Sequence, residues 1–195
     1  HISNLIKGSK LLLGAQDCHY NKNGAFTGDT SIDLIKKFGC KFIIVGHSER
    51  REFHNETDSI IRKKVDLIIS EKIEPIICVG ESEQQRKNNE YLNVLKNQLN
   101  KCVPENLKRV IIAYEPVWSI GTGKVPLIQE IIEIKNFVNE FVKKTKKISE
   151  VNFIYGGSVS SKNAQTFLND SEVNGLLIGG ASLKIEEMKK ILTLG

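Results

Sequence analysis

Six short apolar segments recur along this chain, and each of them ends in glycine or a polar residue. They lie at residues 11–16 (LLLGAQ), 41–46 (KFIIVG), 75–80 (PIICVG), 110–115 (VIIAYE), 152–157 (NFIYGG) and 175–180 (GLLIGG). Most are rich in β-branched residues and none alternates apolar with polar side chains, which is typical of parallel strands buried on both faces. We therefore predict six strands of one parallel sheet.

Helical patterns occupy the stretches between these segments. Apolar residues recur at helical spacing in three of them: Ile61, Val65, Ile68 and Ile69; Tyr91, Leu92, Leu95 and Leu99; and Ile131, Ile134, Val138 and Phe141. Thr57 or Asn55 is expected to cap the first helix, and Pro126 to occupy the first position of the third. Shorter patterns follow at residues 161–168 and 185–192.

The strands begin 30, 34, 35, 42 and 23 residues apart, which is about the length of a βαβ unit. This regularity predicts a single α/β domain over residues 1–195. A doubly wound sheet and a barrel both fit the order of elements. Chemically reactive residues directly follow the strands, for example His47, Glu81, Glu115 and Ser158. A barrel brings all such positions to one mouth, so we favour the barrel.

Composition and charge argue against several classes of protein. The net charge is +5, but lysines are scattered among glutamates, and the densest run (KKTKK, 143–147) is expected at a helix C-terminus rather than on nucleic acid. No membrane-spanning window or leader pattern is found, so we expect a cytoplasmic protein without membrane contacts. The four cysteines are widely spaced, which predicts neither disulfides nor a metal site.

Four longer motifs occur in a fixed order: GHSERR (46–51), AYEPVWSIGTGK (113–124), YGGSV (155–159) and LIGGASLK (177–184). In order and spacing they resemble the triosephosphate isomerase family, and the resemblance extends over essentially all 195 residues. It implies a (β/α)8 TIM barrel. It also implies the glycolytic and gluconeogenic interconversion of dihydroxyacetone phosphate and D-glyceraldehyde 3-phosphate through an enediolate, without a cofactor.

This reaction needs a carboxylate base, a neutral hydrogen-bond donor for the enediolate oxygen, a cradle for the phosphate and a lid against water. The resemblance assigns the base to Glu115, the donor to His47, and a supporting or proton-relay role to Glu49. The alternatives are a structural ion pair for Glu115 and an ordinary core or surface role for His47. Ser48 is not expected to be a nucleophile, because no G-x-S-x-G elbow surrounds it.

Backbone N–H groups beside glycines are natural phosphate ligands. The resemblance places them at Gly121, Ser158, Gly179 and Gly180. The lid spans residues 116–126, and Tyr155 is expected to hold it. The predicted lid residues are Pro116, Val117, Trp118, Ser119, Ile120, Thr122, Gly123 and Lys124.

The stretch QDCHYNKNGAFTGD fits the family's dimerisation loop, which predicts a homodimer for the complete protein. The expected loop residues are Gln16, Cys18, Tyr20, Phe26 and Thr27. The small phosphorylated substrate is the other expected partner.

The chain contains six βα units, whereas a TIM barrel has eight. The resemblance therefore implies strands 3–8, with HISNLIKGSK as the tail of a helix that enters the third strand. The family's first strand carries a lysine in an N-x-K arrangement, and no segment here matches it. The apolar segments 11–16 and 175–180 are then expected to be unpaired edges.

Three hypotheses about function stay open. The first is the triose-phosphate isomerase. The second is another phosphate-binding barrel isomerase or lyase, which leaves Glu115 and His47 unexplained. The third is a non-catalytic, truncated fragment that needs a complementing N-terminal segment to supply the catalytic lysine.

Overall fold

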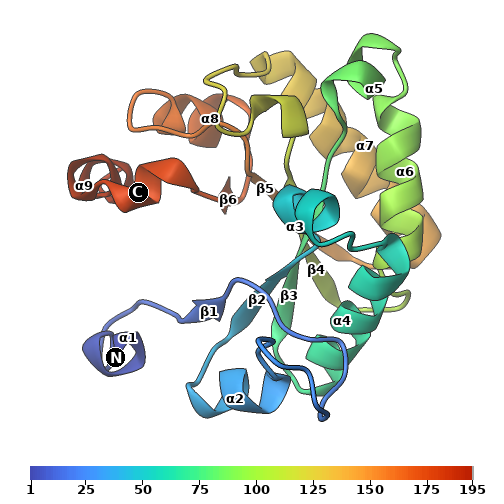
Figure 1. Ribbon diagram of the computed structural model, residues 1–195. Helices are drawn as coiled ribbons and strands as arrows, with labels where there is room; N and C mark the ends of the chain where they lie inside the picture. The colour runs from blue at the N-terminus through green and yellow to red at the C-terminus, as the bar shows by residue number, and fades with distance from the viewer. Residues whose placement is uncertain (195) are drawn as a thin grey trace.

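The computed structural model describes residues 1–194, and within them it shows one parallel sheet of six strands (Figure 1). The strands are β1 (Gly14–Ala15), β2 (Phe42–Val45), β3 (Glu74–Val79), β4 (Arg109–Tyr114), β5 (Glu150–Tyr155) and β6 (Gly175–Leu176). They lie side by side in chain order, all parallel. A doubly wound sheet would reverse its strand order at a switch point, so this curled half-barrel confirms the barrel-type layout.

Helices connect the strands and cover the convex side of the sheet (Figure 1). They are α1 (Ile2–Leu5), α2 (Ile32–Lys37), α3 (Ser48–Phe53), α4 (Asp58–Ser70), α5 (Glu83–Lys87), α6 (Tyr91–Cys102), α7 (Ile128–Lys146), α8 (Ala164–Asp170) and α9 (Ile185–Leu192). Two 3₁₀ turns, η1 (Val117–Ser119) and η2 (Gly180–Leu183), follow β4 and β6. The five predicted helical stretches are confirmed, whereas the short helices α2, α3 and α5 were not predicted.

Helix starts follow the capping chemistry only in part. The side chain of Thr57 accepts a hydrogen bond from the backbone N–H of Ile60 at 3.3 Å, which confirms Thr57 as the cap of α4. The placement of Pro126 at the first position of α7 is wrong, because α7 begins at Ile128. The backbone of the preceding residue, Leu127, is extended, and its N–H donates to the Glu130 carboxylate at 2.7 Å. This side-chain contact three residues later fixes where the helix starts.

The two faces of the sheet are buried to different extents. On the convex face, side chains such as Ile43, Ile77, Ile112 and Phe153 are fully buried under the helices. On the concave face, Ile44, Ile76, Ile111 and Ile154 are only half-buried. The expectation of burial on both faces is therefore wrong for the concave side, since no described element packs over it.

The edge strands are much shorter than the apolar segments that contain them. In β1 only Gly14 and Ala15 pair with β2, and in β6 only Gly175 and Leu176 pair with β5. The edges β1 and β6 face one another on the side of the molecule where both chain ends lie (Figure 1). Among residues 1–194, no helix is both long and apolar enough to cross a membrane.

Candidate active site

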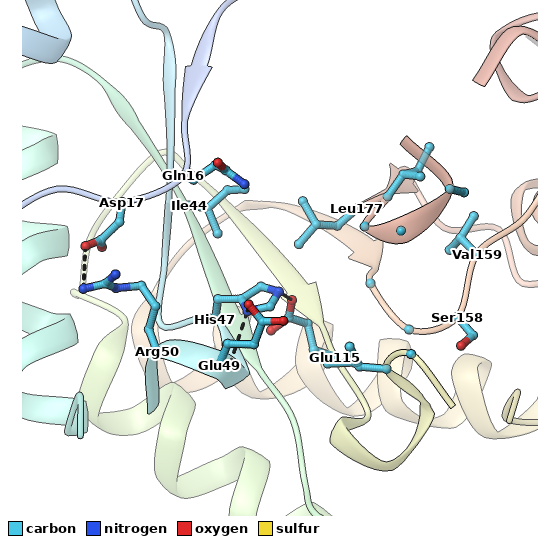
Figure 2. Close-up of a pocket in the computed structure, with 18 of the residues that line it drawn as sticks. Gln16, Asp17, Ile44, His47, Glu49, Arg50, Glu115, Ser158, Val159 and Leu177 are labelled. Atoms are coloured by element: carbon cyan, nitrogen blue, oxygen red, sulfur yellow. Dashed lines mark hydrogen bonds and ion pairs between the residues drawn. The ribbon is translucent and has the colours of Figure 1, made fainter. Parts of the chain in front are cut away.

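A cleft of about 540 Å³ opens at the carboxyl ends of the strands, inside the curl of the sheet (Figure 2). Loops that follow five different strands contribute to its walls. The predicted site residues that line it are Gln16, His47, Glu49, Glu115, Ile120, Gly121, Gly123, Ser158, Gly179 and Gly180. The tertiary structure thus brings together residues that are up to 164 positions apart in the chain.

Glu115 and His47 point toward one another at the floor of this cleft (Figure 2). Glu115 directly follows β4, and its Oε1 lies 3.1 Å from Nε2 of His47, which follows β2. Its other oxygen, Oε2, accepts the backbone N–H of Ser48 at 3.2 Å. The Glu115 backbone N–H donates to the carbonyl of Val79 at 2.8 Å, so both the main chain and the side chain of Glu115 are fixed.

Burial changes the acidity of Glu115. Only 2% of the residue is exposed, and the loss of hydration raises the pKa of its carboxyl group to about 7. The Ser48 amide, the Cys78 thiol and the positive charge of Arg51 lower the pKa and offset part of this effect. A carboxylate with such a pKa is a much stronger base than an exposed glutamate, yet it is still partly ionised at neutral pH.

The protonation state of His47 follows from its contacts. Its Nδ1 accepts the backbone N–H of Glu49 at 3.3 Å, at the start of α3. Burial lowers the pKa of the imidazole, so the ring is neutral at pH 7. A neutral ring whose Nδ1 is an acceptor carries its proton on Nε2. That N–H is the group that faces Glu115 and the cleft.

Two glycines allow the strand ends to approach Glu115 and the lid. A Cβ atom on Gly80 would lie 1.8 Å from the carbonyl oxygen of Glu115. A Cβ on Gly157 would lie 2.2 Å from the Tyr155 hydroxyl and 2.7 Å from the Ser119 hydroxyl. Neither position admits a side chain, so the glycines after β3 and β5 are packing requirements of the site.

The lid has a buried stem and an exposed tip. Ser119 is fully buried, and its hydroxyl donates to the carbonyl of Lys124 at 2.7 Å and lies 3.3 Å from the Tyr155 hydroxyl. The tip reverses direction at Gly121 and Gly123, which have φ angles of +68° and +77°. Residues 121–125 are exposed, although the ammonium of Lys124 contacts the carboxylate of Glu83 at 2.9 Å.

Glu81, which was noted in the sequence but not assigned to the site, anchors the stem of the lid. Its buried carboxylate accepts the indole N–H of Trp118 at 2.9 Å and the hydroxyl of Tyr114 at 3.1 Å. Its backbone carbonyl accepts the N–H of Val117 at 3.0 Å. Trp118 is therefore held by a polar contact, and not only by apolar packing. Burial raises the pKa of Glu81.

The predicted phosphate ligands line the cleft, and Ser158 lies on the side opposite Asp17 (Figure 2). Gly179 and Gly180 are exposed, and no heavy atom lies within 4 Å of a Cβ built on either of them. The backbone N–H of Ser158 donates to the Ser119 hydroxyl at 3.1 Å, and the Ser158 hydroxyl donates to the Ser119 carbonyl at 2.6 Å. A phosphate oxygen at Ser158 would replace the hydroxyl of the lid residue Ser119.

The other end of the cleft is charged, and sequence analysis did not assign it. Asp17 and Arg50 line this end and pair at 3.0 Å (Figure 2). Behind them, the buried ammonium of Lys64 donates to Asp17 at 2.7 Å and also contacts Glu56. Nothing in the local sequence around Asp17 or Arg50 indicates this pairing.

The loop at residues 16–30 folds around His19. The imidazole of His19 stacks on Tyr20 and Phe26, with ring centroids 4.3 and 3.8 Å apart. Of the predicted loop residues, Phe26 and Thr27 are exposed, whereas Cys18 is fully buried in the hydrophobic core.

Among residues 1–194, no group of three or more His, Cys, Asp or Glu side chains is arranged to hold a metal ion. A half-barrel of βα units with a buried carboxylate, an imidazole beside it and glycine-bearing turns at the carboxyl ends of its strands is typical of an α/β-barrel enzyme.

Comparison with known proteins identifies the family within this class. The triosephosphate isomerase family model matches residues 1–194. The triosephosphate isomerase of Aquifex aeolicus is 40% identical over 193 residues, which cover 96% of this chain and 78% of that protein. The enzyme of Alkaliphilus metalliredigens is 42% identical over 188 residues, with 93% and 76% covered.

A solved structure agrees with these sequence matches. The crystal structure of the Bartonella henselae triosephosphate isomerase superposes with a TM-score of 0.87 at 37% identity, covering 98% of this chain and 80% of that one. The chain belongs to the triosephosphate isomerase family. This membership excludes the other phosphate-binding barrel enzymes and favours an isomerase over a non-catalytic fragment.

Proposed function

We propose that the cleft interconverts dihydroxyacetone phosphate and D-glyceraldehyde 3-phosphate by proton transfer through an enediolate. The observation that carries the proposal is the 3.1 Å approach of His47 Nε2 to Glu115 Oε1 at the floor of the cleft. A hydrogen-bond donor and a carboxylate side by side on the floor of the cleft can contact an oxygen and a neighbouring carbon of the same triose. The reaction needs no cofactor, because both functions are supplied by side chains.

Glu115 is the base that removes the carbon-bound proton and returns it to the neighbouring carbon. Its pKa of about 7 supports this role, because proton abstraction is most effective when the pKa of the base lies near the working pH. The ordered contacts to Ser48 and Val79 hold the carboxylate in place before the substrate arrives. Such preorganisation removes an entropic part of the barrier.

His47 donates its Nε2 proton as a hydrogen bond to the oxygen that becomes negative in the enediolate. The donor is neutral, because burial lowers its pKa and the Glu49 amide occupies Nδ1. Triosephosphate isomerase is itself the standard example of a neutral imidazole in this role. Glu49, whose Oε2 lies 3.9 Å from Nδ1 of His47, supports the ring or relays protons.

The phosphate of the substrate binds to the backbone N–H groups of Ser158, Gly179 and Gly180, and to that of Gly121 when the lid closes. The exposed glycines leave room for the anion, and oriented N–H groups stabilise negative charge. Closure of residues 116–126 excludes water from the enediolate, and Tyr155 and Ser158 hold the stem through Ser119.

The sheet corresponds to strands 3–8 of an eight-stranded barrel in one domain. Its two short edge strands and its half-buried concave face support this assignment, since two more parallel strands would pair both edges and cover that face. Among residues 1–194, Arg50 is the cation that lines the cleft, and no lysine does. A lysine on an additional strand would supply the charge that the enediolate needs.

The complete protein is a cytoplasmic homodimer. The partly exposed loop at residues 16–30 supports a contact with a second copy, because it presents the exposed Phe26 and begins at the cleft residue Gln16. Cys18, Cys40, Cys78 and Cys102 are all free thiols, which agrees with a reducing compartment.

The test is the isomerisation of glyceraldehyde 3-phosphate by the chain alone and with an added N-terminal segment of two βα units. Glu115→Asp retracts the base by about one methylene and is expected to lower kcat about 100-fold or more with little change in KM. Glu140→Gln, an exposed carboxylate on α7, is the control and keeps full activity. Unchanged turnover in Glu115→Asp refutes the assignment of the base.

The same assay separates the two parts of the proposal. Near-normal turnover by the chain alone contradicts the need for a further lysine. Absence of turnover in the complemented protein, with its fold intact, contradicts the isomerase function.

A further inference from the structure

Arg51 lies on α3 behind the cleft, where it does not line the wall that faces the substrate. Its guanidinium makes hydrogen bonds in three directions. Nε donates to the carbonyl of Gly46 at 2.8 Å, Nη2 to the carbonyl of Cys78 at 3.1 Å, and Nη1 to the carboxylate of Asp58 at 2.8 Å. Nη2 also lies 3.9 Å from the sulfur of Cys102.

One carbonyl lies at the end of β2, which carries His47, and the other lies in β3, whose last residue binds the backbone of Glu115. Gly46 immediately precedes His47 at the end of β2. Cys78 lies near the end of β3, and the carbonyl of the next residue, Val79, accepts the backbone N–H of Glu115 at 2.8 Å. One rigid guanidinium therefore ties the chain that carries the imidazole to the chain that holds the carboxylate.

The close approach of these groups requires glycine at position 46. Gly46 has a φ of +72°, and a Cβ there would lie 3.2 Å from Nη2 of Arg51 and 3.3 Å from the Cys78 carbonyl. It would also lie 3.0 Å from the side chain of Ile61. The turn before His47 thus leaves just enough space for the planar fork of an arginine.

A second connection runs through the start of α3. The N–H of Ser48 donates to Glu115 Oε2, and the N–H of Glu49 donates to His47 Nδ1. Arg51 follows these residues within the same short helix, so its anchorage to Gly46 and Cys78 also fixes the direction of both N–H groups. A guanidinium suits this task because its donors are held in a rigid plane.

We propose that Arg51 is a positioning residue for the isomerisation, which sets the separation and alignment of His47 and Glu115 by bridging the ends of β2 and β3. The inference rests on the proposed roles of Glu115 as base and His47 as hydrogen-bond donor. It adds a residue that touches neither the substrate nor the reacting atoms.

The charge of Arg51 also acts on Glu115. The groups that face this carboxyl are His47, the Ser48 amide, Glu49, Cys78 and Arg51. Burial raises the pKa of Glu115, the Ser48 amide, Cys78 and Arg51 lower it, and Glu49 raises it. Removal of the positive charge of Arg51 is therefore expected to raise the pKa of Glu115 further.

The test compares Arg51→Lys, which keeps the charge but loses the fork, with Arg51→Met, which loses both. The matched controls are Arg62→Lys and Arg62→Met, because Arg62 pairs with Asp66 on the surface of α4. In both Arg51 variants kcat is expected to fall about 10- to 100-fold while KM changes less than about twofold, as misalignment without lost substrate contacts predicts.

The pH profile of kcat/KM separates alignment from charge. In Arg51→Met the acid limb is expected to shift upward by about one pH unit, and in Arg51→Lys it stays in place. A ¹³C NMR titration of the Glu115 carboxyl follows the same shift without relying on turnover. A purely structural residue would lower thermal stability and leave both the limb and the titration unchanged.

Either of two results overturns the proposal. One is a folded Arg51→Lys variant with the kcat of the unmodified protein. The other is a folded Arg51→Met variant whose acid limb and Glu115 titration do not move. If Arg51→Met does not fold, the kcat of Arg51→Lys decides. Full turnover in Glu115→Gln would instead contradict the role of Glu115 as base. Because the NMR titration of the Arg51 variants does not rely on turnover, it distinguishes a failure of the Arg51 proposal from a failure of the Glu115 assignment.

Discussion

Glu115 is an ionisable group that the fold holds in an unfavourable environment for its charge. Its pKa rises from 4.5 to about 7 on burial, so between these pH values the folded protein binds a proton that the unfolded chain has lost. The contribution of Glu115 to the free energy of unfolding is therefore fully present below pH 4.5 and is lost as the pH rises through 7.

We expect Glu115→Gln to remove this pH dependence. Relative to the unmodified protein, the variant should gain on the order of 3 kcal/mol between pH 4 and pH 8. Urea unfolding at both pH values measures the difference. Glu56→Gln is the contrasting variant, because the hydrogen bonds of Lys64 and Arg50 to Glu56 outweigh its burial and lower its pKa. That variant should lose stability at pH 8, and an equal response of the two variants contradicts the assignment.

The sequence and the structure explain different properties of the lid, residues 116–126. Its glycines and bounding prolines indicate a mobile loop, but its anchorage depends on Glu81 after β3 and Ser158 after β5. Because the stem is bound on both sides and the tip is exposed, movement is expected to concentrate in residues 120–124.

Deletion of residues 120–124 should weaken the binding of the substrate phosphate and should also expose the enediolate to water. Loss of the Gly121 N–H removes one of the proposed phosphate ligands, so KM for glyceraldehyde 3-phosphate should rise about 10-fold or more. The unprotected enediolate should then lose phosphate to solvent. Inorganic phosphate released per turnover, compared with the intact chain, measures this loss. Phosphate release no faster than the background would show that the loop does not protect the intermediate.

In the molecule as a whole, the concave face of the sheet leaves apolar side chains partly exposed. Four side chains are half-buried there: Ile44, Ile76, Ile111 and Ile154. At the β1 edge, Leu11 is 60% exposed and Leu12 is 63% exposed. Apolar surface and unpaired strand edges of this kind promote association.

We expect the 195-residue chain to bind a hydrophobic dye such as ANS and to associate as its concentration rises. The double substitution Ile76→Gln and Ile111→Gln should reduce dye binding, whereas Leu127→Gln, at an exposed site on the helical side, should not. Fluorescence titration and sedimentation velocity test both points. A chain that stays monomeric and binds no dye would show that the concave face is covered.

The order of elements, the barrel-type layout and about half of the residues that line the cleft could be predicted from the amino-acid sequence. β-branched runs, helical periodicity and the polar residue after each strand are local properties, and parallel strands in chain order bring their ends to one rim. His47, Glu115 and Ser158 could be selected in this way because each follows a strand within a recognisable motif.

Which groups contact one another across that rim depends on how the chain folds in space. The tie from Arg51 to Cys78, the hold of Glu81 on Trp118, the pairing of Asp17 with Arg50 and the burial of Cys18 join residues with no shared local pattern. The start of α7 also depended on a side-chain contact, and not on Pro126. Such contacts, and the pKa of about 7 that burial gives to Glu115, depend on distances in space, which spacing along the chain does not fix.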